Sequence, residues 1–84
     1  MNYKENIMAE RLNIDPQEIR DGLARHLKLE MTLKGISIRK VAKLSGVSVA
    51  SLVKYRSAQA DAPLCKIYAL AKAIGVEAKD LLPQ

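Results

Sequence analysis

Three glycines divide most of the chain into segments with the length of short helices. Gly35, Gly46 and Gly75 each follow a run in which apolar residues recur every three or four positions. A glycine after such a run commonly ends an α-helix, because it adopts the left-handed backbone conformation without a steric penalty. No segment alternates apolar and polar residues over the length of a strand. We therefore predict an all-α fold, a compact domain of five helices.

The first helix has the clearest start. Asp15 is placed to act as its N-cap, Pro16 suits the first helical position, and Glu18 lies three residues after the cap. Gly22, inside the helix, lowers its helix propensity. The inward face is predicted from apolar residues that recur every four positions: Ile19, Leu23, Leu27 and Met31.

Two serines start the next two helices. Ser37 caps a second helix that ends near Gly46, with a predicted buried face of Ile38, Val41, Ala42 and Ser45. Ser48 caps a third helix that runs from Val49 to Arg56 or Ser57, with Leu52 and Tyr55 facing inward. Each of these helices has only about two turns.

Two more helices are predicted after a loop. One spans Pro63 to Ile74, and Gly75 closes it. A last short helix spans about Ala78 to Leu82 and stops at Pro83. The longer of the two is expected to bury Leu64, Ile67, Tyr68, Ala71 and Ile74.

The chain length of 84 residues is sufficient for one small domain. We assign this domain to residues 15–82, preceded by an extension of residues 1–14. The extension either forms an amphipathic helix that docks on the domain or is a frayed terminus. Its apolar residues are Tyr3, Ile7, Met8 and Leu12.

Composition excludes several classes of protein. Apolar residues make up 49% of the chain, but Phe and Trp are absent, so the core should be aliphatic. Cys65 is the only cysteine, which rules out an intramolecular disulfide and favours the cytoplasm. No apolar run reaches the roughly 18 residues of a membrane span. His26 is the only histidine, and phosphate loops, nucleophile motifs and paired carboxylates are absent. We therefore expect neither an enzyme nor a metal or cofactor.

The net charge of +5 is concentrated in one segment. Acidic and basic residues nearly balance in residues 1–33 and in residues 57–84. Residues 34–56 contain no acidic residue and hold the cations Lys34, Arg39, Lys40, Lys43, Lys54 and Arg56. Localised positive charge is typical of a surface that binds an anionic partner, of which nucleic acid is the commonest.

The spacing of residues 41–55 is typical of two short helices that cross next to a tight turn. Ala42 has the small side chain that a close crossing requires, and Gly46 can take the positive φ that reverses the chain. The other inner residues should be Val41, Val47, Leu52 and Tyr55. The pattern VAxxxGVSxxxLxxY predicts a helix-turn-helix at about residues 38–57.

The segments GISIRKVAKLSGVSVASLVKYRS and PLCKIYALAKAIGVEAKDLL are similar to the Cro and phage-repressor-like (XRE-type) helix-turn-helix family. The likeness covers about Asp15 to Leu82 and implies a five-helix domain that binds double-stranded DNA. Ser45 stands where the family usually has alanine or a larger aliphatic residue. We therefore expect its hydroxyl to bond back to a carbonyl of its own helix.

The resemblance implies that the third helix enters the major groove. Val49, Ala50 and Lys54 would then face base edges, with the apolar pair on thymine methyl groups and Lys54 on guanine. Val49 and Ala50 replace the polar residues that the family often has there. The residues expected at the DNA backbone are Ser37, Arg39, Lys40, Lys43, Ser48, Ser51 and Arg56.

These features predict a small transcriptional regulator, a phage-type or prophage-type repressor that acts by occluding its operator. A homodimer on a palindromic operator is expected, because a single module contacts too few base pairs to be selective. Two alternatives stay open. One is an antitoxin-like module that binds a protein partner through residues 1–14 and regulates its own synthesis through DNA. The other is a basic module that binds DNA without sequence preference.

Overall fold

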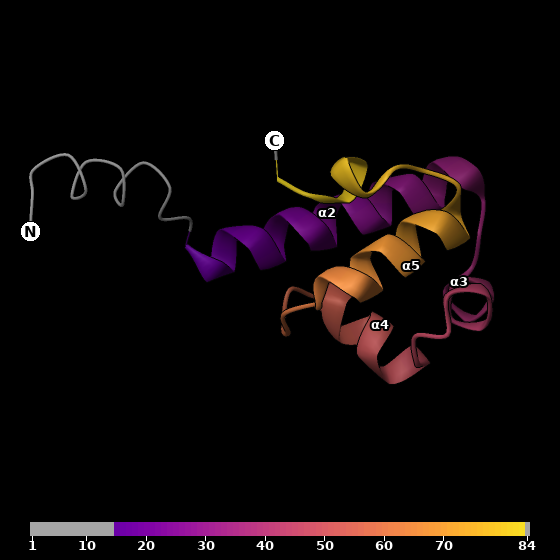
Figure 1. The fold of residues 1–84 in the computed structure, drawn as a ribbon, viewed down its shortest axis with the longest axis horizontal. Helices are drawn as coiled ribbons and strands as arrows, with labels where there is room; N and C mark the ends of the chain where they lie inside the picture. The colour runs from indigo at the N-terminus through magenta and orange to yellow at the C-terminus, as the bar shows by residue number, and fades with distance from the viewer. Residues whose placement is uncertain (1–14, 84) are drawn as a thin grey trace, which may run out of the picture.

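The computed structural model of the chain describes residues 15–83, and the two alternatives for residues 1–14 lie outside this range. The described part is all-helical, as predicted (Figure 1). It consists of α-helices and a final 3-10 helix, namely α2 (Pro16–Lys34), α3 (Ile38–Ser45), α4 (Val49–Arg56), α5 (Leu64–Ile74) and η1 (Ala78–Leu81).

The predicted starts of α2, α3 and α4 are confirmed by side-chain hydrogen bonds, whereas α5 begins at Leu64, one residue after the predicted Pro63. The carboxylate of Asp15 accepts a hydrogen bond from the Gln17 N–H at 3.0 Å. The hydroxyl of Ser37 accepts one from the Lys40 N–H at 3.1 Å, and that of Ser48 accepts one from the Ser51 N–H at 3.1 Å. The last helix differs from the prediction, because it forms a single 3-10 turn in place of an α-helix.

A single aliphatic core joins all five elements. It contains Tyr55 as its aromatic residue and otherwise Leu23, Leu27, Met31, Val41, Ala42, Val47, Leu52, Ile67, Leu70, Ala71, Ile74 and Leu81. Leu27, Leu52, Leu70, Leu81 and Val41 are fully buried. No charged or polar residue is buried within residues 15–83. The helices are therefore held together by burial of apolar surface.

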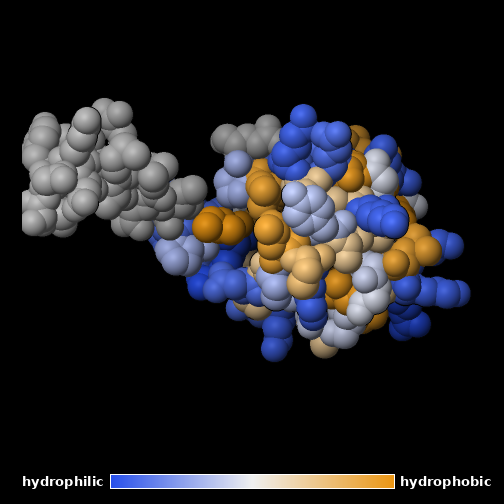
Figure 2. Space-filling model, in the orientation of Figure 1, coloured by the Kyte–Doolittle hydropathy of each residue, from blue (hydrophilic) through white to orange (hydrophobic). Residues whose placement is uncertain are grey.

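The prediction for the inward face of α5 was partly wrong. Tyr68 and Leu64 are each 60% exposed, whereas Leu70 is fully buried. Both choices fit a helical period, but the stripe that meets the core contains Ile67, Leu70, Ala71 and Ile74. Hydrophobic side chains are interspersed with hydrophilic ones across the domain in Figure 2.

The inward face of α2 was predicted correctly except at its first residue. Leu23, Leu27 and Met31 are buried, but Ile19 is 37% exposed. Ile19 lies in the first turn of α2, beside a small apolar hollow at the loop before α5. The core ends before it reaches this turn.

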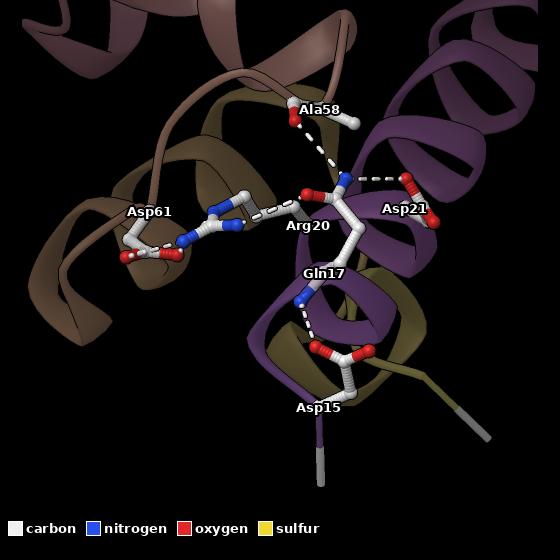
Figure 3. A network of polar contacts seen from close by, with 6 residues as sticks. All are labelled: Asp15, Gln17, Arg20, Asp21, Ala58 and Asp61. Atoms are coloured by element: carbon white, nitrogen blue, oxygen red, sulfur yellow. Dashed lines mark hydrogen bonds and ion pairs between the residues drawn. The ribbon is translucent and has the colours of Figure 1, made fainter.

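Polar contacts connect the start of α2 to the loop between α4 and α5 (Figure 3). Arg20 binds the carboxylate of Asp61 through Nε at 2.8 Å and through Nη2 at 3.3 Å. The side-chain amide of Gln17 donates to the carbonyl of Ala58 at 3.3 Å. Because these groups are solvated, the ion pair contributes only about 0–1 kcal/mol. Their main effect is to orient the loop that follows α4.

The C-terminal segment explains why a glycine occupies the middle of α2. Gly22 is buried, and the ring of Pro83 lies against its Cα. A Cβ at position 22 would lie 2.7 Å from Cγ of Pro83, which is too close for two carbon atoms. The segment after η1 runs beside α2 (Figure 1), and the absence of a side chain at residue 22 allows this close contact.

Because of this contact, we expect the effects of Gly22→Ala and Pro83→Gly on the free energy of unfolding to be coupled. Alanine is about 1 kcal/mol more favourable than glycine inside a helix. We expect that gain in the Pro83→Gly background, and a loss of stability when Pro83 is present. Urea unfolding of the two single variants and the double variant measures the coupling, expected at about 1–2 kcal/mol. Additive effects would show that Pro83 does not restrict position 22.

Candidate nucleic-acid interface

The turn between α3 and α4 has the geometry that its sequence predicts. Gly46 has φ of 77° and ψ of 4°, in the left-handed region. Its N–H donates to the carbonyl of Ala42 at 3.0 Å, which ends α3. The next residue, Val47, is only 3% exposed, so the chain reverses and returns to the core within three residues of Ser45.

The hydroxyl of Ser45 stabilises this turn. It donates to the carbonyl of Ala42 at 3.5 Å, which is the predicted bond to its own helix but at a long distance. It also accepts a hydrogen bond from the Val47 N–H at 3.1 Å. The second contact gives the hydroxyl a role that the aliphatic residue usual in the family could not have. Ser45 satisfies a backbone donor that the reversal would otherwise leave unpaired.

The residues predicted to support the helix-turn-helix are where they were expected. Val41, Ala42, Val47, Leu52 and Tyr55 are all buried. They come from both helices and from the turn, and they pack into the same core as α2 and α5. This packing fixes the orientation of α4 relative to α3.

The opposite side of α4 faces solvent. Val49 is 43% exposed, and Ala50 and Lys54 are also exposed. Leu52 and Tyr55 occupy the buried side, so the residues predicted to read bases share the outward side of the helix. A helix of this kind can be inserted into a groove about 12 Å wide without disturbing the core.

Val53 belongs to the same outward side and was missed. It is 48% exposed and lies four residues after Val49, so the two are neighbours on the helix surface. Ala50 and Lys54 are related in the same way. The i, i+4 relation was visible in the sequence, but the prediction for base contacts included only Val49, Ala50 and Lys54.

The residues predicted at the DNA backbone lie on α3, on α4 and at the N-caps of both helices. Arg39, Lys40 and Lys43 are exposed on α3, while Ser37 and Ser48 are exposed N-caps. Ser51 and Arg56 are half-buried on α4. The hydroxyls of both N-caps already accept backbone hydrogen bonds, so any contact they make to an anion would use hydroxyl or backbone hydrogens.

The positive charge of this region is uncompensated. The ion pairs within residues 15–83 are Arg20 with Asp61 and Lys79 with Glu77, and both lie outside the helix-turn-helix. The cations of residues 34–56 have no carboxylate partner in the described part of the chain. Such a surface attracts anions, and the attraction is weakened by salt.

Other chemical sites are not indicated in residues 15–83. No group of three His, Cys, Asp or Glu side chains is arranged to hold a metal ion in this range. Cys65 is exposed and His26 is half-buried on α2. None of the described helices is both long and apolar enough to cross a membrane.

The structure has the form of a helix-turn-helix: α3 and α4 are joined by a glycine turn, and one side of α4 is exposed. A family comparison identifies the particular group. The helix-turn-helix family of the Cro and phage-repressor type matches residues 27–81, so the chain belongs to that family. Membership places it among DNA-binding proteins that regulate transcription.

Solved structures agree with this assignment. The chain is similar to the restriction-modification controller protein C.AhdI from Aeromonas hydrophila, with 28% identity and a TM-score of 0.69. That match covers 73% of this chain and 92% of C.AhdI. A hypothetical transcription factor, NHTF from Neisseria, is also 28% identical, with a TM-score of 0.74, covering 83% of this chain and 80% of NHTF. No curated protein sequence gives a significant match.

Proposed function

We propose that this chain binds specific double-stranded DNA sequences and represses transcription by occluding its operator. The observation that carries the proposal is the outward side of α4, where Val49, Ala50 and Lys54 are exposed, in a segment whose cations have no carboxylate partner within residues 15–83. Similarity to a restriction-modification controller and to a transcription factor supports a regulatory role. The chain's own contacts with DNA then follow from the chemistry of these side chains.

Base reading would combine apolar contacts with one hydrogen-bonding residue. Val49 and Ala50 have no side-chain donor or acceptor, but they can pack on thymine methyl groups in the major groove. Val53 would extend the same apolar surface by one turn. Lys54 can donate to O6 or N7 of guanine. The expected half-site therefore contains a T-rich step and a G.

Phosphate contacts would position α4 in the groove. Arg39, Lys40 and Lys43 extend from α3, and the first turn of α3 after Ser37 adds backbone N–H groups that have no partner within the helix. Ser48, Ser51 and Arg56 would complete this set from α4. Contacts of this kind supply affinity without sequence information.

Selectivity requires more than one such module. A single half-site contains too few base pairs to be distinguished from the many competing sites in a genome. We propose a homodimer on a palindromic operator, with half-sites about one helical turn apart. Sedimentation equilibrium with and without operator DNA measures this stoichiometry.

Selection of binding sites from random duplex DNA tests the proposed function. An enriched palindrome, with a T-rich step and a G in each half, is the expected result. A pool that stays random while the protein still binds duplex DNA would identify a non-specific DNA-binding module instead. The spacing between enriched half-sites reports the geometry of the dimer.

Replacing Lys43 with alanine should weaken binding to all DNA sequences about equally. Lys43 is exposed on α3 and has no carboxylate partner within residues 15–83, so we assign it to a phosphate contact. The slope of log K against log salt should flatten by about 0.9 for each phosphate that the variant no longer neutralises. Fluorescence anisotropy over a salt series measures both quantities, with Lys66→Ala on α5 as the control. A changed base preference would contradict the phosphate assignment.

A further inference from the structure

A hollow of about 390 Å³ lies between the middle of α2 and the C-terminal end of α4, and residues of both helices line it. Three of its lining residues are cations: Arg25 and Lys28 from α2, and Arg56 from α4. Its one acidic residue is Asp21, whose carboxylate accepts a hydrogen bond from the side-chain amide of Gln17 at 2.9 Å. The hollow therefore has an excess of positive charge.

The three cations have no ion-pair partner within residues 15–83. Arg56 is half-buried, and its Nε is fully buried without a hydrogen-bond acceptor. A buried donor without an acceptor is uncommon, so Arg56 is held in place by packing and not by an internal ion pair. Like charges around one hollow repel each other, and an anion bound there would reduce this repulsion.

Arg56 connects this hollow to the start of α3. It also lines a second hollow on its other side, together with Thr32, Gly35 and Ser37. The second hollow also reaches Ile38, the first residue of α3, and exposed Arg39 and Lys40 follow it in the first turn of that helix. Cations therefore extend from α2 across Arg56 to α3. A nucleic-acid strand, which carries one negative charge at each phosphate, is the anion that matches an extended row of this kind.

We propose that Arg25, Lys28 and Arg56 form an additional phosphate-binding site for the DNA strand beside the groove that α4 enters. This inference rests on the proposed function, and it extends the DNA interface to α2. The charge distribution along the sequence does not indicate it, because Arg25 and Lys28 lie in a segment where acidic residues balance the basic ones. The fold brings them beside Arg56.

Salt-dependent binding of a charge-removing variant tests the site. The Arg25→Gln/Lys28→Gln variant changes exposed side chains only, so its stability should match the parent protein. We expect weaker binding to a duplex with the selected operator, unchanged base preference, and a salt slope flattened by about 0.9 for each phosphate left without its cation. The control variant, Lys66→Gln/Lys72→Gln, removes the same charge from α5 and should keep the parent slope.

Arg56 is tested by paired substitutions, because its side chain is half-buried. Arg56→Gln should flatten the slope, and Arg56→Lys should retain it, since lysine keeps the charge. A slope unchanged in Arg25→Gln/Lys28→Gln, or equally flattened in the α5 control, would overturn the site. If selection yields no operator, a mixed-sequence duplex of equal length replaces it. The slope of log K against log salt then tests the α2 site, whereas the failed selection counts against the proposed function.

Discussion

Valine in place of Gly46 should destabilise the domain by about 1–3 kcal/mol, which is the cost of holding a non-glycine residue in the left-handed region. Gly46 has φ of 77°, and a residue branched at Cβ is the least compatible with that region. Total stability for a domain of this size is only about 4–12 kcal/mol, so the loss is large. Urea unfolding of the variant beside the parent protein measures it.

The loss should come from backbone strain, because space is available at this position. A Cβ built on Gly46 has no other atom within 4 Å, apart from its chain neighbours. Graded substitutions test this cause: Gly46→Asn should be tolerated best, Gly46→Ala less well and Gly46→Val least, since asparagine enters the left-handed region more readily. If valine and asparagine variants unfolded at the same urea concentration, the strain argument would be wrong.

The second large effect is expected at Lys54. Lys54→Ala should reduce discrimination at one base pair of each half-site by about 1–3 kcal/mol, which is about 5-fold to 150-fold in relative affinity. Lys54 is exposed, and its ammonium group has no carboxylate partner within the described residues, so the folded state should be unaffected. Binding-site selection with the variant identifies the position that becomes degenerate.

A matched control separates base reading from general attraction to DNA. Lys40→Ala removes the same charge from α3 and should lower affinity without changing base preference. An enriched sequence identical for Lys54→Ala and the parent protein would remove Lys54 from the base-reading residues. Val49, Ala50 and Val53 would then be left to supply specificity through thymine methyl contacts and groove shape.

The predictions that the structure confirms depend on local interactions. Ser37 and Ser48 bond to N–H groups three residues ahead, and Gly46 ends α3 through a bond four residues back. Such contacts involve residues within one turn of helix, so the residue types and their spacing are sufficient to predict them. The buried side of α4 was predictable for the same reason, because Leu52 and Tyr55 occupy one face.

The predictions that failed, and the features that were missed, depend on residues far apart in the chain. Tyr68 and Leu70 both fit the apolar repeat of α5, and only the neighbouring helices select Leu70 for the core. Gly22 is required by Pro83, which lies against it and comes 61 residues later in the chain. A single helical repeat does not state which neighbours it meets, so these choices lay beyond sequence reasoning.

The sequence by itself determined the helix-turn-helix: its caps, its glycine turn, its inner residues and the run of cations from Lys34 to Arg56. Capping and turn formation act over a few residues, and the charge is counted along the chain. Only the tertiary structure decided that Arg25 and Lys28 of α2 lie beside Arg56 of α4. The hydrophobic effect is non-directional, so it does not specify contacts between individual exposed side chains. Those neighbours are set by how whole helices pack together.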